Sequence, residues 1–165
     1  IEIKTKKENV DYRKLIAAGS CFAEGEEVID YGFVERWILG LEEKYGVEVM
    51  QVGYDRYNAI STVQKLEANS MECVEVKQHS SVLHPPTKLL REAILKKEFA
   101  YDENRLLEIN FQNARCTEDT NLNKYVNKKR SAGKVDMVVS TIIAVYLMQQ
   151  AMLDNSELDW GIQVI

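Results

Sequence analysis

Hydrophobic and polar positions follow one another along this chain in a pattern that predicts alternating helices and strands. Around residue 37, apolar side chains recur at helical spacing: Phe33, Trp37, Ile38 and Leu41. This spacing predicts a helix over 33–45 that ends at Gly46. The apolar segment 47–54 predicts a strand, 58–69 a helix and 71–76 a second strand. A strand, a helix and a strand in this order are typical of a parallel pair joined by a crossover.

The second half of the chain predicts further helices around the sheet. Pro85 and Pro86 suit the head of a helix over 87–97, because the first helical turn tolerates proline. The apolar stretch 135–152 predicts a buried terminal helix. The other predicted elements are a helix over 10–18 with Asn9 as its N-cap, an edge strand over 99–101, a segment at 104–113 that fits either period, and a loop or hairpin over 117–133. The whole pattern predicts the α/β class, with a mixed sheet flanked by helices.

The composition indicates a single globular domain but does not indicate which reaction it catalyses. The 165 residues suit one domain with its own core. No apolar run approaches the roughly 18 residues of a membrane span, and no signal peptide is visible. The three cysteines are far apart in the sequence and form no CxxC pair, which indicates reduced thiols in a cytosolic setting. His79 and His84 lack the i, i+4 spacing of a zinc motif, and no glycine-rich phosphate loop is present.

Charge is distributed unevenly along the chain. The net charge of −5 gives no general attraction to nucleic acid. The segment 124–134, however, holds five basic residues and no acid: Lys124, Lys128, Lys129, Arg130 and Lys134. Such a segment is either a solvated loop or a local contact to phosphate groups. Because it leads directly to Asp136, the second interpretation would place phosphate beside a carboxylate.

Two aspartates occupy positions that suit a shared site. Asp55 closes the predicted strand, and ligands of open α/β sheets gather at the carboxyl ends of strands. Asp136 opens the apolar terminal helix, where a carboxylate needs a cation or hydrogen-bond donors. Two acids at one sheet edge can bind divalent metal ions, and such ions can cut phosphodiester bonds. The structural alternatives are a turn or N-cap role for Asp55 and a dipole-stabilised surface acid for Asp136.

Five short stretches, taken in order over about residues 12–150, resemble the nuclease domain of the large terminase subunit of tailed phages or prophages. They are YRKLIAAG followed by EGEEVIDYGFV, the segment YDRYNA at 54–59, Gln78 followed by PPTKLLREAI, the set Asn104, Leu107, Asn113 and Ala114, and the segment KKRSAGKVDMVVSTIIA. No single stretch is decisive, and the order of the five carries the resemblance.

This resemblance implies a ribonuclease-H-like fold whose acidic cluster binds two Mg²⁺ or Mn²⁺ ions. By motif position, Asp55 would be the strand acid and Asp136 the helix acid. The five basic residues of segment 124–134 would guide the DNA backbone by charge, without reading the nucleotide sequence. The implied task is the cutting of concatemeric viral DNA during genome packaging in the host bacterial cytoplasm. The implied partners are double-stranded DNA, the portal and the small terminase subunit, with no membrane.

The sequence departs from the family pattern at its beginning. A further catalytic aspartate is expected on the first strand of the fold, and nothing ahead of Tyr12 fits it. We therefore expect the first strands upstream of Ile1, and residues 1–165 to be a single nuclease domain, the C-terminal portion of a longer chain without its ATPase domain. We also expect this part alone to bind Mn²⁺ weakly and to cut DNA poorly.

Two other interpretations stay open at this stage. The first is another ribonuclease-H-like phosphoryl-transfer enzyme, such as a resolvase or transposase core. The second is a non-catalytic α/β interaction module that docks a partner through the apolar helix at 135–152 and the acidic tail at 154–165. In that module Asp55 would be a cap and Asp136 a surface acid.

Overall fold

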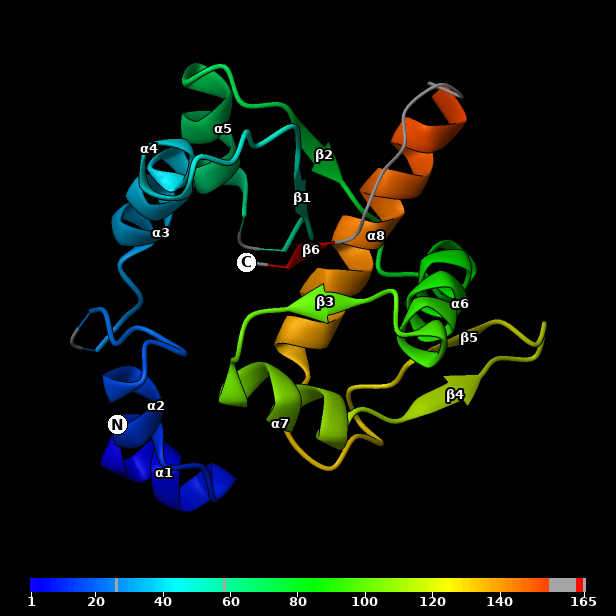
Figure 1. Ribbon diagram of the computed structural model, residues 1–165, viewed down its shortest axis with the longest axis horizontal. Coiled ribbons are helices and arrows are strands. Elements are labelled where there is room, and N and C mark those ends of the chain that lie inside the picture. The colour runs from blue at the N-terminus through cyan, green and yellow to red at the C-terminus, as the bar shows by residue number, and fades with distance from the viewer. Residues whose placement is uncertain (26, 58, 155–162, 165) are drawn as a thin grey trace. The chain divides into compact units, whose positions relative to one another are not determined.

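Two compact units make up the structure. Residues Glu24–Gln78 form one of them, called the inserted unit here, and Ile1–Ala23 with His79–Ile165 form the other, called the main unit. The computed structural model describes residues 1–25, 27–57 and 59–154 and, for the backbone alone, 163–164 (Figure 1). Most of the predicted acidic tail therefore lies outside the described residues.

The inserted unit is built on a parallel strand pair. Its elements are α3 Tyr31–Leu39, α4 Leu41–Tyr45, β1 Val52–Tyr54, α5 Ile60–Ala68 and β2 Cys73–Glu75. In the sheet Gly53 lies opposite Val74, and the chain passes from β1 to β2 through α5. This pairing confirms the predicted strand, helix and strand, although each paired strand is shorter than the apolar run that predicted it.

The predicted helix over 33–45 is two helices that meet at Gly40. This residue ends α3, its N–H donates to the Arg36 carbonyl at 3.0 Å, and α4 begins directly after it. A Cβ at position 40 would lie 3.2 Å from that carbonyl oxygen, so glycine allows the close approach. Gly46, with a φ of 67°, ends α4 as predicted, because a left-handed residue is a common helix terminus.

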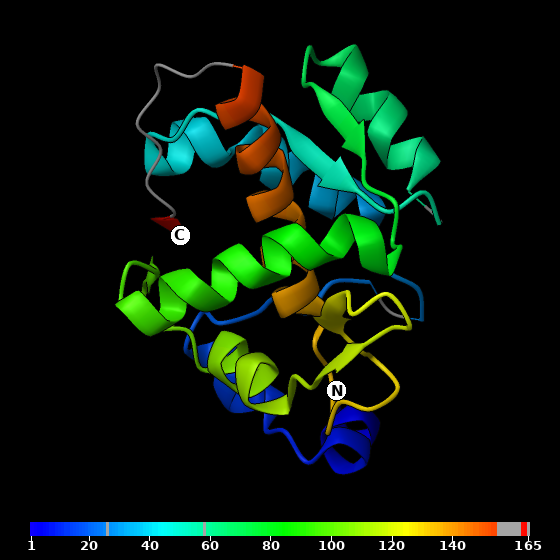
Figure 2. The same cartoon turned by 90° about the vertical axis from the view of Figure 1, so that its right-hand side faces the viewer.

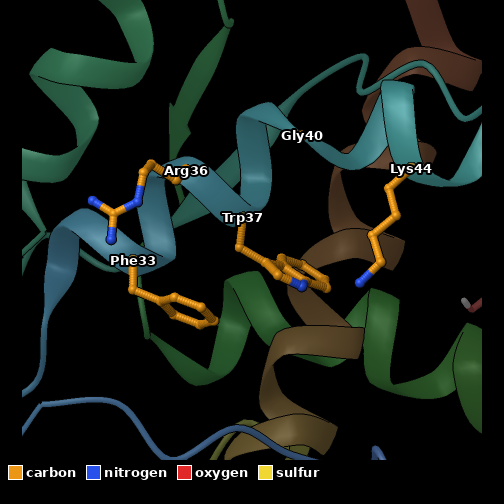
Figure 3. A pocket seen from close by; sticks show the side chains of 5 residues that line it. All are labelled: Phe33, Arg36, Trp37, Gly40 and Lys44. Carbon is orange, nitrogen blue, oxygen red and sulfur yellow. The ribbon is translucent and has the colours of Figure 1, made fainter.

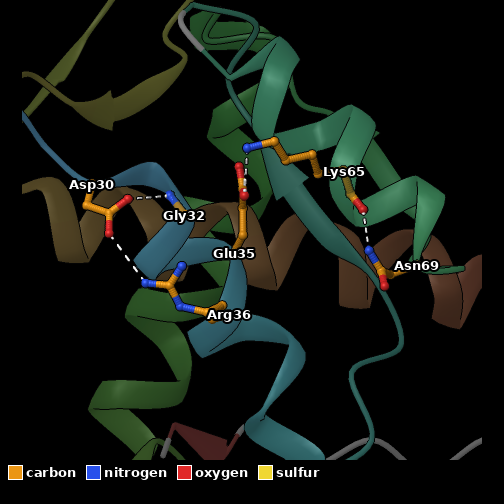
Figure 4. A network of polar contacts seen from close by, with 6 residues as sticks. All are labelled: Asp30, Gly32, Glu35, Arg36, Lys65 and Asn69. Carbon is orange, nitrogen blue, oxygen red and sulfur yellow. Dashed lines mark hydrogen bonds and ion pairs between the residues drawn. The ribbon is translucent and has the colours of Figure 1, made fainter.

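A partly buried ion pair joins α3 to α5 (Figure 4). The Glu35 side chain is 10% exposed and accepts a hydrogen bond from Lys65 Nζ at 3.0 Å. Its second oxygen has no hydrogen-bond partner among the described residues, so Lys65 alone compensates the carboxylate. Asp30 caps α3 by accepting from the Gly32 N–H at 2.9 Å. Leu66 of α5, which is 1% exposed, contributes to the apolar core of this unit.

The main unit is mostly helical. Its elements are α1 Glu2–Glu8, α2 Tyr12–Ala17, α6 Ser80–Lys96, β3 Ala100–Tyr101, α7 Arg105–Asn113, β4 Cys116–Glu118, β5 Lys124–Val126, α8 Asp136–Asp154 and β6 Gln163–Val164. The strands β3 and β6 pair in parallel, and β4 and β5 form an antiparallel hairpin. Parallel and antiparallel pairs both occur, as predicted, but the described strands form three separate two-stranded sheets.

Helix α8 forms the core of the main unit. Figure 2 shows the green helix α6 crossing the orange helix α8, and α7 also packs on α8. The contacts bury Val138, Ile142 and Val145 of α8 with Leu90 of α6 and Leu107 of α7. By length and composition alone α8 could cross a membrane, but these contacts give its apolar residues a place in the core. The predicted buried terminal helix is therefore confirmed.

Two predicted helix starts in the main unit are wrong in their details. Helix α6 begins at Ser80, well before the predicted residue 87, so both prolines lie inside it. His79 caps this earlier start by accepting from the Ser81 N–H at 3.3 Å, and the prolines leave only nearby first-turn carbonyls without an amide partner. Asn9, the predicted N-cap of the next helix, instead ends α1 with a φ of 53°, and Asp11 caps α2.

The ambiguous segment at 104–113 is helical because of its first residue. The Asn104 side chain accepts from the backbone N–H groups of Leu106 and Leu107, both at 3.1 Å, and so satisfies two donors at the start of α7. The predicted loop or hairpin over 117–133 contains the β4–β5 hairpin, which packs against α6.

Candidate functional site

The head of α8 is fixed by a buried asparagine from α7. Asn110 is 3% exposed, and its side-chain oxygen accepts from the Met137 N–H at 3.2 Å. Its amide nitrogen donates to the Leu106 carbonyl at 2.9 Å. The asparagine thereby satisfies one of the unpaired donors at the start of α8, directly beside Asp136. Sequence reasoning missed Asn110, whose only signal was a polar residue three positions after Leu107 on an apolar helical face.

Asp136 is the first residue of α8, and a lysine from the basic segment contacts it. Its side chain is 65% exposed, and Lys128 Nζ lies 3.6 Å from Oδ1. The helix N-terminus also favours a negative charge here. The structure therefore brings together the predicted helix acid and one of the predicted DNA-binding residues.

Lys129 and Arg130 are presented by a turn that Asn127 organises. The Asn127 side-chain oxygen accepts from the N–H groups of Lys129 at 3.0 Å and Arg130 at 3.2 Å. Its carbonyl accepts from the Ser131 hydroxyl at 2.8 Å. Both basic side chains are exposed, so the turn fixes the backbone while the charged groups face solvent.

The end of this loop is anchored to the end of α7. The Asn113 side chain donates to the Lys134 carbonyl at 3.2 Å, and the Asn113 carbonyl accepts from the Ala132 N–H at 3.0 Å. A Cβ on Gly133 would lie 2.7 Å from the Asn113 amide nitrogen, so a larger residue here would displace the Asn113 side chain. The Asn113 of the resemblance thus has a structural role, which is to hold the loop that carries the bases.

Lys124 is more heavily engaged than the other four bases. Its ammonium pairs with Glu118 across the hairpin at 3.0 Å, and its N–H donates to the His84 ring at 2.7 Å. With His79 capping α6, both histidines have structural roles, in line with their missing zinc spacing. Lys124 is thus partly neutralised, whereas Lys128 pairs with the candidate acid itself.

Asp119 holds the turn of the hairpin against the start of α6. It accepts hydrogen bonds from the Ser80 hydroxyl at 2.6 Å and from the N–H groups of Asn123 at 2.9 Å and Asn121 at 2.8 Å. These donors, the Ser80 hydroxyl first, hold the pKa of Asp119 well below its usual range. The acid is therefore ionised and structurally occupied, which distinguishes it from the exposed Asp136.

Tyr12 of α2 belongs to the surroundings of Asp136. Burial and the hydrogen bond that Tyr12 donates to Glu8 raise the pKa of its hydroxyl, and the charge of Asp136 adds to this effect. The ammonium of Lys4 lies over the Tyr12 ring, with Nζ 5.1 Å from the ring centroid. The Tyr12 hydroxyl therefore lies within electrostatic range of the head of α8.

Asp55 directly follows β1 of the inserted unit. Its Oδ1 accepts from the Tyr57 N–H at 3.3 Å, which is the turn geometry that the structural alternative predicted. Asp136 belongs to the main unit, so a metal ion shared by these two aspartates stays a prediction. Among the described residues, no three His, Cys, Asp or Glu side chains are grouped to hold a metal.

The inserted unit also carries a shallow hollow of about 270 Å³ (Figure 3). It is lined by Phe33, Arg36, Trp37, Gly40 and Lys44 of α3 and α4. The lining includes two aromatic and two basic side chains but no carboxylate or other hard metal ligand. The hollow is therefore unrelated to the chemistry that the two aspartates predict.

Comparisons with known proteins agree with the predicted resemblance. A family model described as the terminase large subunit, endonuclease domain, matches residues 2–152. Among solved structures, the crystal structure of the HK97 bacteriophage large terminase matches with a TM-score of 0.79 and 20% sequence identity. The match covers 88% of this chain and 30% of the HK97 chain, so this chain spans less than a third of that relative. It confirms the predicted ribonuclease-H-like α/β fold class. A search of curated proteins found no match.

Proposed function

Because this chain belongs to the family of terminase large subunit endonuclease domains, we propose that residues 1–165 act as one nuclease domain that cuts concatemeric viral DNA during genome packaging. The family match supports the reaction class, and the likeness to the HK97 terminase supports the fold. We propose that the domain works within a longer large subunit, in keeping with the length of that relative.

The observation that carries this proposal is the contact between Lys128 and Asp136. It places a carboxylate at the head of α8 beside a loop whose exposed bases suit phosphate groups. Hydrogen bonds between the loop backbone and the Asn127 and Asn113 side chains fix that loop, so its charges are held near the acid. Such basic side chains contact phosphates and not the edges of nucleobases, which suits cutting without a sequence requirement.

The proposed cofactor is Mg²⁺ or Mn²⁺ in a two-metal site, held by Asp55 and Asp136. Carboxylate oxygens are the ligands that these hard ions prefer, and the Lys128 ammonium beside Asp136 shows that the carboxylate already attracts a cation. When bound, the ions would activate a water molecule and stabilise the leaving oxygen. The chain's own contribution is to hold the acid on a rigid helix and to bind the DNA backbone beside it.

We also propose partners and a location that follow from this role. The substrate is double-stranded DNA, and the large subunit would assemble with the portal and the small terminase subunit in the host bacterial cytoplasm, without membrane contact. The family match supports the DNA substrate.

Removal of divalent metal provides the direct test of this function. The large subunit that carries the domain should cut linear duplex DNA in Mg²⁺ or Mn²⁺, lose all cutting in EDTA and regain it when Mn²⁺ is restored. Gel analysis should show equal rates on a linear duplex and on a four-way junction. Junction preference would instead favour the resolvase interpretation, and cutting in EDTA would contradict the proposed chemistry.

Replacing Lys128 with Gln should strengthen Mn²⁺ binding to the 165-residue chain by about two- to fivefold. The ammonium competes with a metal ion for Asp136, and an exposed ion pair is worth roughly 0.2–1 kcal/mol. Electron paramagnetic resonance of free Mn²⁺ would measure the change. Lys129→Gln is the matched control, since it removes the same charge from the neighbouring exposed residue. An equal gain in both variants would mean that Lys128 has no specific effect.

A further inference from the structure

Three lysines of α1 form no ion pair in the described structure. All three acids within residues 1–14 are engaged elsewhere: Glu2 pairs with Arg13, Asp11 pairs with Lys14 at 3.7 Å, and Glu8 accepts from the Tyr12 hydroxyl. The ion pairs of the described residues include none with the α1 lysines, which are Lys4, Lys6 and Lys7. The helix therefore presents a positive patch of three exposed lysines that form no ion pair.

The core of the main unit does not need this patch. Helix α1 has no buried residue, and all three lysine side chains are exposed. Lysines in the last turn stabilise the helix modestly through its dipole, but three charges within four positions exceed what a seven-residue helix requires. Their arrangement is thus better explained by an external anion.

The patch belongs to the same region as the candidate acid. Lys4 lies over the Tyr12 ring, and Tyr12 is near enough to Asp136 for the two to interact electrostatically. In Figures 1 and 2, α1 lies at the same end of the main unit as α7, whose last residues anchor the basic loop. Two separate positive surfaces therefore occur around the head of α8.

We propose that Lys4, Lys6 and Lys7 form a second contact to the phosphate backbone of duplex DNA, in addition to the loop that contains Lys128. This inference rests on the proposed nuclease function. A duplex whose phosphate reaches Asp136 has further phosphates along both strands. Basic side chains around Asp136 would neutralise these phosphates and release their counterions. The contact holds the duplex in place and contributes no sequence preference.

A paired substitution with a matched control tests the contact. Lys6 and Lys7 lie in the last turn of α1, whereas Lys96 and Lys97 lie in the last turn and at the C-cap of α6. Lys6→Gln with Lys7→Gln therefore removes the same charge as Lys96→Gln with Lys97→Gln, and both pairs lie at the C-terminal end of a helix. A third variant adds Lys4→Gln to the first pair, and a fourth carries Lys6→Arg with Lys7→Arg.

Fluorescence anisotropy of the 165-residue chain with a duplex of about 30 base pairs, over a range of salt concentrations, gives the readout. The Lys6/Lys7 glutamine variant should bind about tenfold more weakly at about 0.1 M salt, with the slope of log affinity against log salt reduced by about 1.8. Adding Lys4→Gln should weaken binding further. The control pair and the arginine pair should match the wild type.

Each other outcome has a defined meaning. One outcome is that the wild type binds the duplex and the Lys6/Lys7 glutamine variant has the affinity and salt slope of the Lys96/Lys97 control. The second contact is then overturned, while the proposed function stands. If the wild type does not bind the duplex, the second contact is overturned. The proposed function fails only if the large subunit that carries the domain also shows no Mn²⁺-dependent cutting of linear duplex. Ile1 and Ile3 are also exposed, so vesicles of anionic lipid are a further probe. Loss of vesicle binding with unchanged DNA binding would assign the lysines to a lipid surface instead.

Discussion

Asp136→Asn should lower the cleavage rate of the large subunit by two to three orders of magnitude, the equivalent of about 3–4 kcal/mol of transition-state stabilisation. The substitution keeps the size and polarity of the side chain but removes the negative charge that would bind a metal ion. It also removes the ion pair with Lys128, which is exposed and therefore of small value to stability. The unfolding temperature should stay nearly unchanged, and plasmid nicking in Mn²⁺ measures the rate.

The same helix supplies the control for this experiment. Asp154 is the last residue of α8 and is exposed, so Asp154→Asn removes one carboxylate from the opposite end of the same element. Its cleavage rate should equal that of the wild type. Asp55→Asn should reproduce the loss caused by Asp136→Asn. A large subunit in which both aspartates are Asn and cleavage continues at the normal rate would rule out the proposed site and leave the interaction module as the better explanation.

Asn110→Ala should lower the free energy of unfolding by about 2 kcal/mol, because two hydrogen bonds of a buried side chain are lost together. The change leaves the Met137 N–H without its partner at the start of α8. For a chain of this size the loss corresponds to a fall in Tm of roughly 4–8 °C, which differential scanning calorimetry measures. Because Asp136 precedes Met137, Mn²⁺ affinity should fall as well.

An exposed asparagine in the hairpin turn gives the comparison for this second prediction. Asn121→Ala removes the same side chain from a solvent-exposed position, and the change in stability should stay within about 0.5 kcal/mol. If Asn110→Ala were equally mild, the head of α8 would not depend on this hydrogen bond. A large loss of stability with unchanged Mn²⁺ binding would separate the role of Asn110 in folding from its proposed effect on the site.

The elements that sequence periodicity predicted best are those whose local pattern and tertiary role agree. The apolar stretch that became α8 is buried where it contacts α6, and the segments around β1 and β2 pair in parallel as their order implied. Boundaries were predicted less well, because capping decides them. His79 starts α6 ahead of its prolines, and Gly40 divides one predicted helix into two.

The surroundings of the candidate acid depended on contacts between residues distant in sequence. Asn110 reaches Met137, and Asn113 reaches the carbonyl of Lys134, and periodicity does not report such side-chain bonds. The basic segment was visible in the sequence as a charge run. The ion pair between Lys128 and Asp136 could not be predicted in this way, because it depends on the loop geometry that Asn127 imposes. Whether Asp55 joins them depends on two units that periodicity does not relate to each other.

The ion pair between an ammonium and a carboxylate at the head of α8 couples DNA binding to metal binding in the proposed enzyme. Lys128 has one positive charge and two potential anionic neighbours, the carboxylate in the free protein and a phosphate in the bound state. When nucleic acid draws the lysine away, the carboxylate becomes available to a divalent ion. Thermodynamic linkage then requires each ligand to raise the affinity for the other by the same factor. In the absence of DNA the site would thus hold little metal, and cleavage would begin only once a duplex is bound.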